Sequence, residues 1–263
     1  MSDNNFLVEE HDHICKIVIN RADRRNSFTL AMWKEFTEIM RGLNGKDHIR
    51  VAIIRGAGEK AFSSGIDLAE LASTGKSITD PSSWEEIGIE QAMHSITEFR
   101  YPVVAMVNGY AIAGGCELAL HCDVIIAADT ARFAMPLAKI GLMIPFPLAQ
   151  RLVNAVGVTN ARDMLYTGRM VPAAEARQMG MVKEVVPLAE LEGRVLEVAG
   201  EIAGNAPLSL EGMKKTLARC FAYEQRIEYD DLRQHMGRCL SSEDVMEGVM
   251  AFMQRRKPEF QGK

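Results

Sequence analysis

The sequence predicts an α/β protein whose strands pair largely in parallel, and two observations support that prediction. The first is the pair of wholly apolar runs at residues 51–54 and 103–107, which have the composition of strands buried on both faces of a sheet. The second is the order of segments, because connections with helical spacing separate successive strand-like runs. Strands joined repeatedly by such crossovers return to one sheet in parallel.

Strand-like and helix-like patterns alternate through the first half of the chain. Residues 29–43 place apolar side chains at helical spacing, which predicts the first helix. A second helix is expected over residues 83–100, because Glu86 follows Ser83 by three positions, as in a capping box. A third should begin near Gly114. The strands expected in this half are residues 13–20, 51–54, 103–107 and 123–128.

The second half of the chain has helical patterns almost throughout. The expected helices are residues 145–156, 159–168, 172–180, 188–205, 207–220, 224–240 and 243–256, and residues 181–186 are strand-like. The composition changes near Pro187 without a flexible linker, so we expect a core over residues 1–187 and a helical oligomerisation region over residues 188–263. Apolar side chains in that region need a surface to pack against. An oligomer interface and the chain's own core are both open as that surface.

Composition and charge argue against several classes of function. The 263 residues carry a net charge of -5, and no basic stripe typical of nucleic-acid binding is present. The five cysteines form no CxxC pair, and His11 and His13 have no further metal ligands beside them. The first residues lack the apolar stretch of a signal peptide, and no apolar run reaches the ~18 residues of a membrane span. We therefore expect a cytoplasmic protein with no metal, membrane or nucleic-acid partner.

Two glycine-containing turns, at residues 60–68 and 108–118, follow the buried strands and are candidates for chemistry. Ligands of parallel α/β sheets bind at the carboxyl ends of strands, where both turns are expected. Glycine permits a close approach of the backbone, and a helix that begins at Gly114 has free N–H groups at its start. Two such donors would stabilise the negative oxygen of a thioester enolate.

Glu117 lies three residues after Gly114, on the same face of the expected helix. A carboxylate there could move a proton beside the thioester carbonyl, and the helix dipole should favour its ionised form, which suits a base. From the residues alone, close packing by the glycines and a simple dipole partner for Glu117 are the commoner explanations of these features, and both stay open. Neither turn has the spacing of a P-loop or of a dinucleotide-binding fingerprint.

These turns, in their order and separation, resemble those of the crotonase superfamily, the enoyl-CoA hydratase/isomerase family, and the resemblance extends over nearly the whole chain. The matching segments are residues 17–21 with 24–27, residues 61–68, residues 108–119 with Cys122 and Asp123, and residues 242–258. The resemblance implies a crotonase-like spiral of ββα units with a C-terminal helical trimerisation region. It also implies a homotrimer or a homohexamer.

The resemblance implies the residues of the site as well. The N–H groups of Ile66 and Gly114 would be the oxyanion donors, and Glu117 matches the family's first catalytic glutamate. The CoA contacts would be Arg25, Ser27, Ser63, Ser64, Gly65, Asp67 and Leu68, with Arg255 reaching a CoA phosphate of a neighbouring subunit. CoA is expected only as part of the acyl-CoA substrate, and no permanently bound cofactor is implied.

One position departs from the family pattern, because Leu137 stands where the hydratases have their second glutamate. A leucine transfers no proton, so a substitute acid would have to come from elsewhere, for example from residues 73–90 with Asp80, Glu85, Glu86 and Glu90. The first hypothesis is an enoyl-CoA hydratase or isomerase type of enzyme. A malonyl-type acyl-CoA decarboxylase and a CoA-ester-binding protein without hydratase activity are the alternatives.

Overall fold

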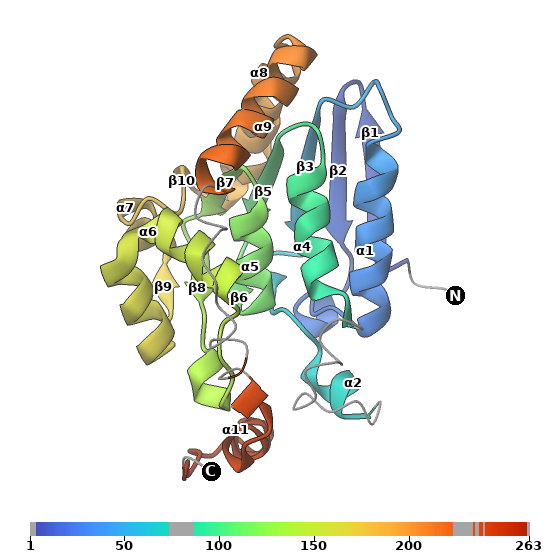
Figure 1. Ribbon diagram of the computed structural model, residues 1–263. Helices are drawn as coiled ribbons and strands as arrows, with labels where there is room; N and C mark the ends of the chain where they lie inside the picture. The colour runs from blue at the N-terminus through green and yellow to red at the C-terminus, as the bar shows by residue number, and fades with distance from the viewer. Residues whose placement is uncertain (1–3, 74–86, 223–233, 235–236, 239, 262–263) are drawn as a thin grey trace.

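The computed structural model describes residues 4–73, 87–222, 234, 237–238 and 240–261. These residues form two sheets with helices packed around them (Figure 1). The expected α/β class with a largely parallel sheet is thereby confirmed.

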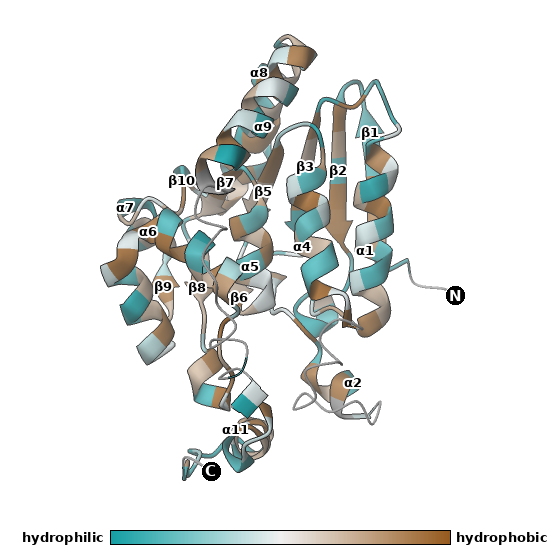
Figure 2. Cartoon of the chain, viewed as in Figure 1, coloured by the Kyte–Doolittle hydropathy of each residue, from teal (hydrophilic) through white to brown (hydrophobic). Residues whose placement is uncertain are grey.

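The larger sheet has six strands in the order β1-β2-β3-β5-β7-β10. Their bounds are β1 Phe6–His11, β2 Ile14–Ile19, β3 Val51–Gly56, β5 Val103–Val107, β7 Val124–Ala128 and β10 Glu184–Val186. Only β1 runs antiparallel to its neighbour, and the other pairs in this sheet are parallel. The central strands are almost wholly buried, as their apolar sequences predict, and they are largely brown in Figure 2. The sequence analysis missed β1, an edge strand whose last five residues are exposed.

A smaller sheet has the order β4-β6-β8-β9, with β4, β6 and β8 parallel to one another and β9 antiparallel to β8. Its strands are β4 Ala61–Ser63, β6 Tyr110–Ile112, β8 Arg132–Ala134 and β9 Val171–Pro172. Along the chain, β4, β6 and β8 follow β3, β5 and β7, and a helix comes after each pair of strands. Three successive ββα units are the result, which agrees with the spiral that the resemblance implies.

Three helices lie side by side along the larger sheet in Figure 1, namely α1 Leu30–Leu43, α4 Ile89–Glu98 and α5 Gly114–His121. The first helix was predicted correctly, and Thr29 caps it by accepting a hydrogen bond from the Met32 N–H at 3.2 Å. Helix α4 begins after Gly88, which has a φ of 83°. The capping box expected at Ser83 and Glu86 lies outside the described residues.

The remaining helices are mostly in the second half of the chain. They are α2 Leu68–Ser73, α6 Phe146–Thr167, α7 Ala173–Gln178, α8 Leu191–Ala203, α9 Pro207–Ala222 and α11 Glu243–Gln254, with single 3-10 turns η1 Ala22–Arg24, η2 Leu137–Ile140 and η3 Leu188–Glu190. Gly157, at φ 75°, divides α6 near the point where two separate helices were expected. The helix expected over residues 224–240 lies largely outside the described residues.

Two helices of the C-terminal region contact the core of their own chain. Helix α8 packs against β2, β3, β5 and β7. Helix α9 is attached through Lys214, whose ammonium donates to the carbonyl oxygens of Ile96 at 3.1 Å and Tyr101 at 2.8 Å and pairs with Asp123 at 2.8 Å. The division at residue 187 stays a prediction, but the chain beyond it contributes directly to the packing of the sheet.

Two further features of the described residues bear on function. None of their helices has both the length and the hydrophobicity that crossing a bilayer requires. Among the same residues, no three side chains of the metal-binding types gather closely enough to hold an ion.

Candidate active site

The two glycine turns lie at one edge of the smaller sheet. Parallel strands β4 and β6 end at Ser63 and Ile112, and the turns begin directly after them. The Ala113 N–H donates to the Ala134 carbonyl at the end of β8, at 2.9 Å, so the third strand ends at the same edge. The turns were expected at the carboxyl ends of strands 51–54 and 103–107, which belong to the larger sheet. They lie instead at the carboxyl ends of β4 and β6 in the smaller sheet. The segments 60–68 and 108–118, predicted as turns throughout, each contain one of these three-residue strands.

The turns touch each other backbone to backbone, and glycine makes that contact possible. A Cβ atom on Gly65 would lie 2.7 Å from the Gly114 nitrogen, and one on Gly115 would lie 2.0 Å from the Ser63 carbonyl oxygen. Gly65 also has a φ of 81°, which any other L-residue adopts only with strain. Residues 65 and 115 must therefore be glycine for the two turns to meet.

The Ile66 N–H points away from the segment that supports it. The Gly65 carbonyl accepts from the Phe28 N–H, and the Asp67 N–H donates to the Phe28 carbonyl, both at 2.8 Å. Along an extended chain, successive N–H groups point to opposite sides, so the Ile66 N–H is directed away from Phe28. The hydrogen bonds of the described residues leave this group without an acceptor.

The Gly114 N–H is free for a different reason. Gly114 is the first residue of α5, and the N–H groups of a first turn have no partner inside the helix. Ala113 precedes it with φ 49° and ψ -120°, a conformation that costs alanine on the order of 1–3 kcal/mol. Within the described part of the chain, no acceptor contacts the Gly114 N–H either. The strained turn thus leaves a second N–H group without an acceptor in that part of the chain, at the end of the smaller sheet.

One aromatic stack packs against the backbone segments that carry the Ile66 and Gly114 N–H groups. The rings of Phe28 and Trp33 stack with centroids 4.2 Å apart and are fully buried. Phe28 forms the bridge to Ile66, and the Trp33 ring lies 3.5 Å from the position of a Cβ on Gly114. The backbone segments that carry the two N–H groups therefore pack against one aromatic stack.

Glu117, one turn along α5 from Gly114, is a buried carboxylic acid. Only 7% of the residue is exposed, and burial raises its pKa to about 7. The expectation that Glu117 favours its ionised form is wrong, because burial of the carboxyl group favours the protonated form. No donor among the described residues contacts the carboxyl group. A neutral imidazole at His121, whose pKa is lowered to about 3 by burial, accompanies it and contacts the Glu117 carbonyl oxygen through Nδ1 at 2.7 Å.

The residues expected to contact CoA fall into two groups. Arg25 is exposed on the loop before Asn26, and Ser64 and Leu68 are half-buried near the Gly65 turn. Ser63 is fully buried, and its hydroxyl donates to the Asn26 carbonyl at 2.8 Å and accepts from the Gly65 N–H at 3.1 Å. Its side chain therefore supports the turn, and a contact of Ser63 with CoA stays a prediction for its backbone.

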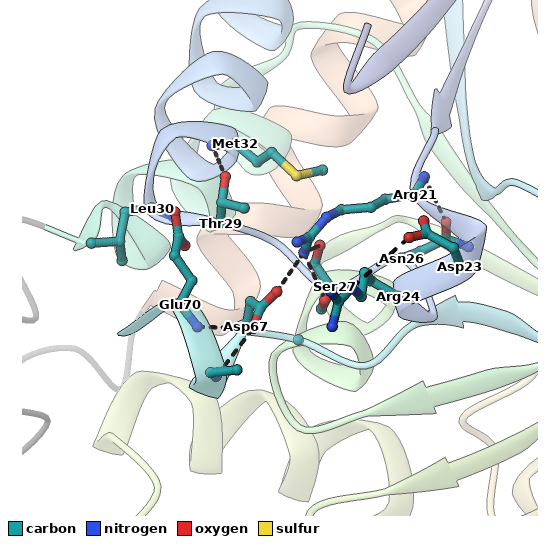
Figure 3. A network of polar contacts seen from close by, with 12 residues as sticks. Arg21, Asp23, Arg24, Asn26, Ser27, Thr29, Leu30, Met32, Asp67 and Glu70 are labelled. Atoms are coloured by element: carbon teal, nitrogen blue, oxygen red, sulfur yellow. Dashed lines mark hydrogen bonds and ion pairs between the residues drawn. The ribbon is translucent and has the colours of Figure 1, made fainter. Parts of the chain in front are cut away.

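Ser27 and Asp67 are likewise engaged inside the protein. Both accept hydrogen bonds from Arg21, at 3.0 Å and 2.7 Å, and Figure 3 shows the three side chains together. Arg21 is a partner in this network that the sequence pattern did not predict, although it follows strand β2 within a matched segment. The pattern also did not predict buried Asn26 and Asn108, which both donate to the Ala61 carbonyl and so hold the start of β4. The left-handed φ of 54° at Asn26 has no signature in a single sequence beyond the residue type.

Leu137 opens the 3-10 turn η2, three residues after β8 ends, and it packs half-buried against the core. Helix α11 packs on the same turn, and Gly248 allows the contact because a Cβ there would lie 2.6 Å from Ile140. Arg255 follows α11 and is exposed. Of the proposed substitute acids, Glu90 is exposed and lies 4.0 Å from His94, whereas Asp80, Glu85 and Glu86 lie outside the described residues.

Comparisons with known proteins agree with the observed fold. A family model described as enoyl-CoA hydratase/isomerase matches residues 9–263. The short-chain-enoyl-CoA hydratase of Clostridium acetobutylicum is 30% identical over 258 residues, which are 97% of each chain. A crystal structure of enoyl-CoA hydratase from Bacillus anthracis is 32% identical, with a TM-score of 0.78 over 99% of this chain and 100% of that one. Methylmalonyl-CoA decarboxylase in complex with 2-nitronate-propionyl-CoA is 28% identical, with a TM-score of 0.89 over the whole of both chains.

Proposed function

The chain belongs to the enoyl-CoA hydratase/isomerase family, and from that premise we propose that it converts an acyl-CoA thioester through an enolate, as a hydratase or isomerase type of enzyme. One observation carries the proposal. Two backbone N–H groups without acceptors among the described residues, those of Ile66 and Gly114, lie on turns in direct contact, and the buried carboxyl group of Glu117 is one helical turn away.

The two N–H groups would stabilise the enolate oxygen. When an enoyl thioester is attacked, or when it loses an α or γ proton, negative charge develops on the carbonyl oxygen. Fixed donors in a site shielded from water are each worth roughly 3 kcal/mol to such a transition state. The charge is greater in the transition state than in the bound substrate, so the donors favour reaction over mere binding.

Glu117 would move the proton. A pKa of about 7 suits a group that must both accept and release a proton near neutral pH. In hydration, ionised Glu117 takes a proton from water as the oxygen bonds to the β carbon and the double-bond electrons move to the thioester carbonyl. The same proton then passes from Glu117 to the α carbon, so one carboxylate completes the addition of water. In isomerisation, Glu117 removes a proton from one carbon and returns it to another.

Two observations favour a second candidate, the decarboxylation of a malonyl-type thioester. Leu137 supplies no second carboxylate, and the decarboxylase structure named above superposes with a high TM-score. In that reaction the bond between the α carbon and the carboxylate breaks, carbon dioxide leaves, and the electron pair enters the enolate. A proton then adds to the α carbon. The oxyanion donors are required, whereas the second carboxylate is not.

The binding mode and assembly proposed for the chain follow the family. CoA would enter as part of the substrate, along Arg25 and the Gly65 turn, with Arg255 of a neighbouring subunit on a phosphate and with no permanently bound cofactor. A homotrimer or homohexamer in the cytoplasm is proposed. Exposed apolar side chains on the C-terminal helices support an assembly, and they are Leu208, Met213, Leu217, Met246, Met250, Phe252 and Met253.

The test is a panel of CoA thioesters with the whole protein and its Glu117→Gln variant. Short and medium 2-enoyl-CoA substrates are followed by the absorbance of the conjugated thioester, 3-enoyl-CoA substrates by its appearance, and malonyl-type thioesters by release of carbon dioxide. Turnover that falls to background in Glu117→Gln supports hydration or isomerisation. Carbon dioxide release that survives in Glu117→Gln supports the decarboxylase, and CoA binding without any reaction leaves only a binding function.

A further inference from the structure

Arg21 and Asp67 form a partly buried ion pair that connects two loops of the site. The Arg21 Nη1 atom lies 2.7 Å from Asp67 Oδ2, and the same atom donates to the carbonyl and hydroxyl oxygens of Ser27 at 3.1 Å and 3.0 Å (Figure 3). Only 23% of the Arg21 side chain and 12% of the Asp67 side chain are exposed. The guanidinium therefore joins the loop after β2 to the segment after β4.

Asp67 is the residue next to the oxyanion donor Ile66. Its second carboxylate oxygen accepts from the N–H groups of Ala69 and Glu70, both at 3.1 Å, so it also caps helix α2. Burial opposes ionisation of Asp67, but the Arg21 hydrogen bond and these two N–H groups prevail and keep its pKa below the usual value. Both oxygens of the ionised Asp67 carboxylate therefore accept hydrogen bonds, one from Arg21 and the other from the start of α2.

Glu70 extends the network to the helix that supports the aromatic stack. Its Oε2 accepts from the Leu30 N–H at 3.0 Å, at the start of α1. The first turn of α1 leads to Trp33, which packs beside Gly114. The segment around Ile66 is therefore tied to Arg21 on one side and to α1 on the other.

We propose that Arg21 is a positioning residue, whose ion pair with Asp67 fixes the direction of the Ile66 N–H in the oxyanion site. The inference rests on the proposed enolate function and assigns this ion pair a role within the same site. The direction of the Ile66 N–H depends on both neighbouring residues: Phe28 holds the Gly65 carbonyl and the Asp67 N–H, and Arg21 holds the Asp67 side chain. The Nη1 atom of Arg21 donates to three oxygens, two of Ser27 and one of the Asp67 carboxylate. Arg25, by contrast, is exposed, and its side chain has no partner among the described residues.

The experiment compares Arg21→Met, Arg21→Lys and Asp67→Asn in the whole protein. Arg194→Met is the matched control, because Arg194 pairs with Glu184 and Glu197 at a similar exposure on α8, away from the site. Four quantities are measured: kcat and KM on the substrate found above, the Kd of free CoA, and the melting temperature. Free CoA has no acyl carbonyl, so its binding does not use the oxyanion donors.

A positioning role predicts that Arg21→Met lowers kcat about 10- to 100-fold, while the Kd of free CoA stays within about twofold of wild type. Asp67→Asn has a similar effect, the double variant is no worse than either single one, and Arg21→Lys regains part of kcat. Arg194→Met leaves kcat unchanged. A parallel loss of CoA affinity makes Arg21 a CoA contact, and an unchanged kcat in a folded Arg21→Met makes the pair merely structural. Either result overturns the proposal.

A second readout separates this proposal from the proposed function. Acetoacetyl-CoA is a 3-keto thioester whose enolate absorbs differently from its keto form, and its ionisation on the protein requires no turnover. Wild type that raises the enolate fraction, with Arg21→Met raising it less, supports the positioning role even if no enoyl substrate is converted. Equal enolate fractions in wild type and Arg21→Met contradict it, whatever the enzyme's reaction. Asp67→Asn serves in its place if Arg21→Met fails to fold.

Discussion

Gly65 and Gly114 meet so closely that a Cβ on Gly65 would lie 2.7 Å from the Gly114 nitrogen. The contact places the first residue of α5 against the turn that precedes Ile66, and both free N–H groups emerge beside it. Neither donor alone distinguishes this edge from an ordinary helix start or an ordinary turn. The contact between Gly65 and Gly114, which brings the two turns together with Glu117 one helical turn away, is what makes this edge a candidate site for an enolate.

Gly65→Ala should strongly lower activity and destabilise the protein. The added Cβ clashes with backbone atoms of Gly114, which cannot move aside as a flexible side chain can, and alanine disfavours a φ of 81°. We expect a loss of about 2–4 kcal/mol in the free energy of unfolding and at least about 100-fold in kcat. Urea unfolding and turnover check both. Gly193→Ala is the control, since no atom lies within 4 Å of its Cβ position on α8. It should keep full activity, and a tolerated Gly65→Ala would refute the tight contact.

Activity should rise with pH around neutrality. If ionised Glu117 is the base, kcat/KM follows its deprotonation in the free enzyme, and burial has raised that pKa to about 7. The expected profile increases about tenfold per pH unit below the midpoint and levels above it. A profile that stays flat down to about pH 5 would show that Glu117 titrates lower, and a decrease through neutrality would mean that the protonated acid is the active form.

Glu117→Gln should stabilise the fold at alkaline pH while removing activity. The folded pKa of about 7 exceeds the ordinary value of 4.5, so between these values the folded state binds more protons than the unfolded one. Stability therefore decreases as pH rises through that window. The amide of the variant does not titrate, and its advantage at about pH 8 is on the order of 3 kcal/mol, against little at about pH 4. Urea unfolding at both values tests this, and a difference independent of pH would contradict it.

Leu137→Glu should increase hydratase turnover if only a second carboxylate is missing. Leu137 follows the end of β8 by three residues and is half-buried, so a glutamate there can be accommodated with modest loss of stability. We expect a gain of about tenfold or more over wild type on short 2-enoyl-CoA, the size of a modest acid–base contribution. Leu137→Gln, equal in shape but unable to transfer a proton, is the control. Equal rates in the two variants would rule out a missing carboxylate.

Lys214→Met should detach α9 from the core. Its side chain is only 9% exposed, and its ammonium serves two carbonyl oxygens and Asp123, all of which lose a partner. A loss of about 2–4 kcal/mol in the free energy of unfolding is expected, because two carbonyl oxygens and the Asp123 carboxylate each lose a hydrogen bond, and among the described residues Asp123 keeps only the one from the Val103 N–H. Lys215→Met changes an exposed neighbour and should cost well under about 1 kcal/mol. Equal effects would contradict the anchoring role.

The main elements of the fold could be predicted because their patterns are long. The run at 103–107 and the apolar face of α1 each extend over enough residues to indicate one structure. Strands β4, β6 and β8 have three residues each, too few for any period to emerge. The two glycine turns follow these short strands, so the position of the site relative to the larger sheet could be predicted only approximately.

Some features of the candidate site could likewise be predicted from the sequence, and others depend on the fold. The glycines of both turns are visible in the sequence because a close backbone approach demands that residue type. The strain at Ala113, the Phe28–Trp33 stack and the Arg21–Asp67 pair depend on residues far apart in the chain. The raised pKa of Glu117 could not be foreseen either, because it depends on burial by the surrounding elements and not on its place in the helix.

The ionisation of bound acetoacetyl-CoA tests the central claim most directly, because it reports on the oxyanion donors alone. The ligand is titrated with pH in the presence of saturating Glu117→Gln protein, which removes the competing carboxylate, and the enolate absorbance is recorded. Two preorganised N–H donors should lower the enolisation pKa of the bound ligand by roughly 2 units or more relative to free solution. Binding with an unchanged enolisation pKa would contradict the account.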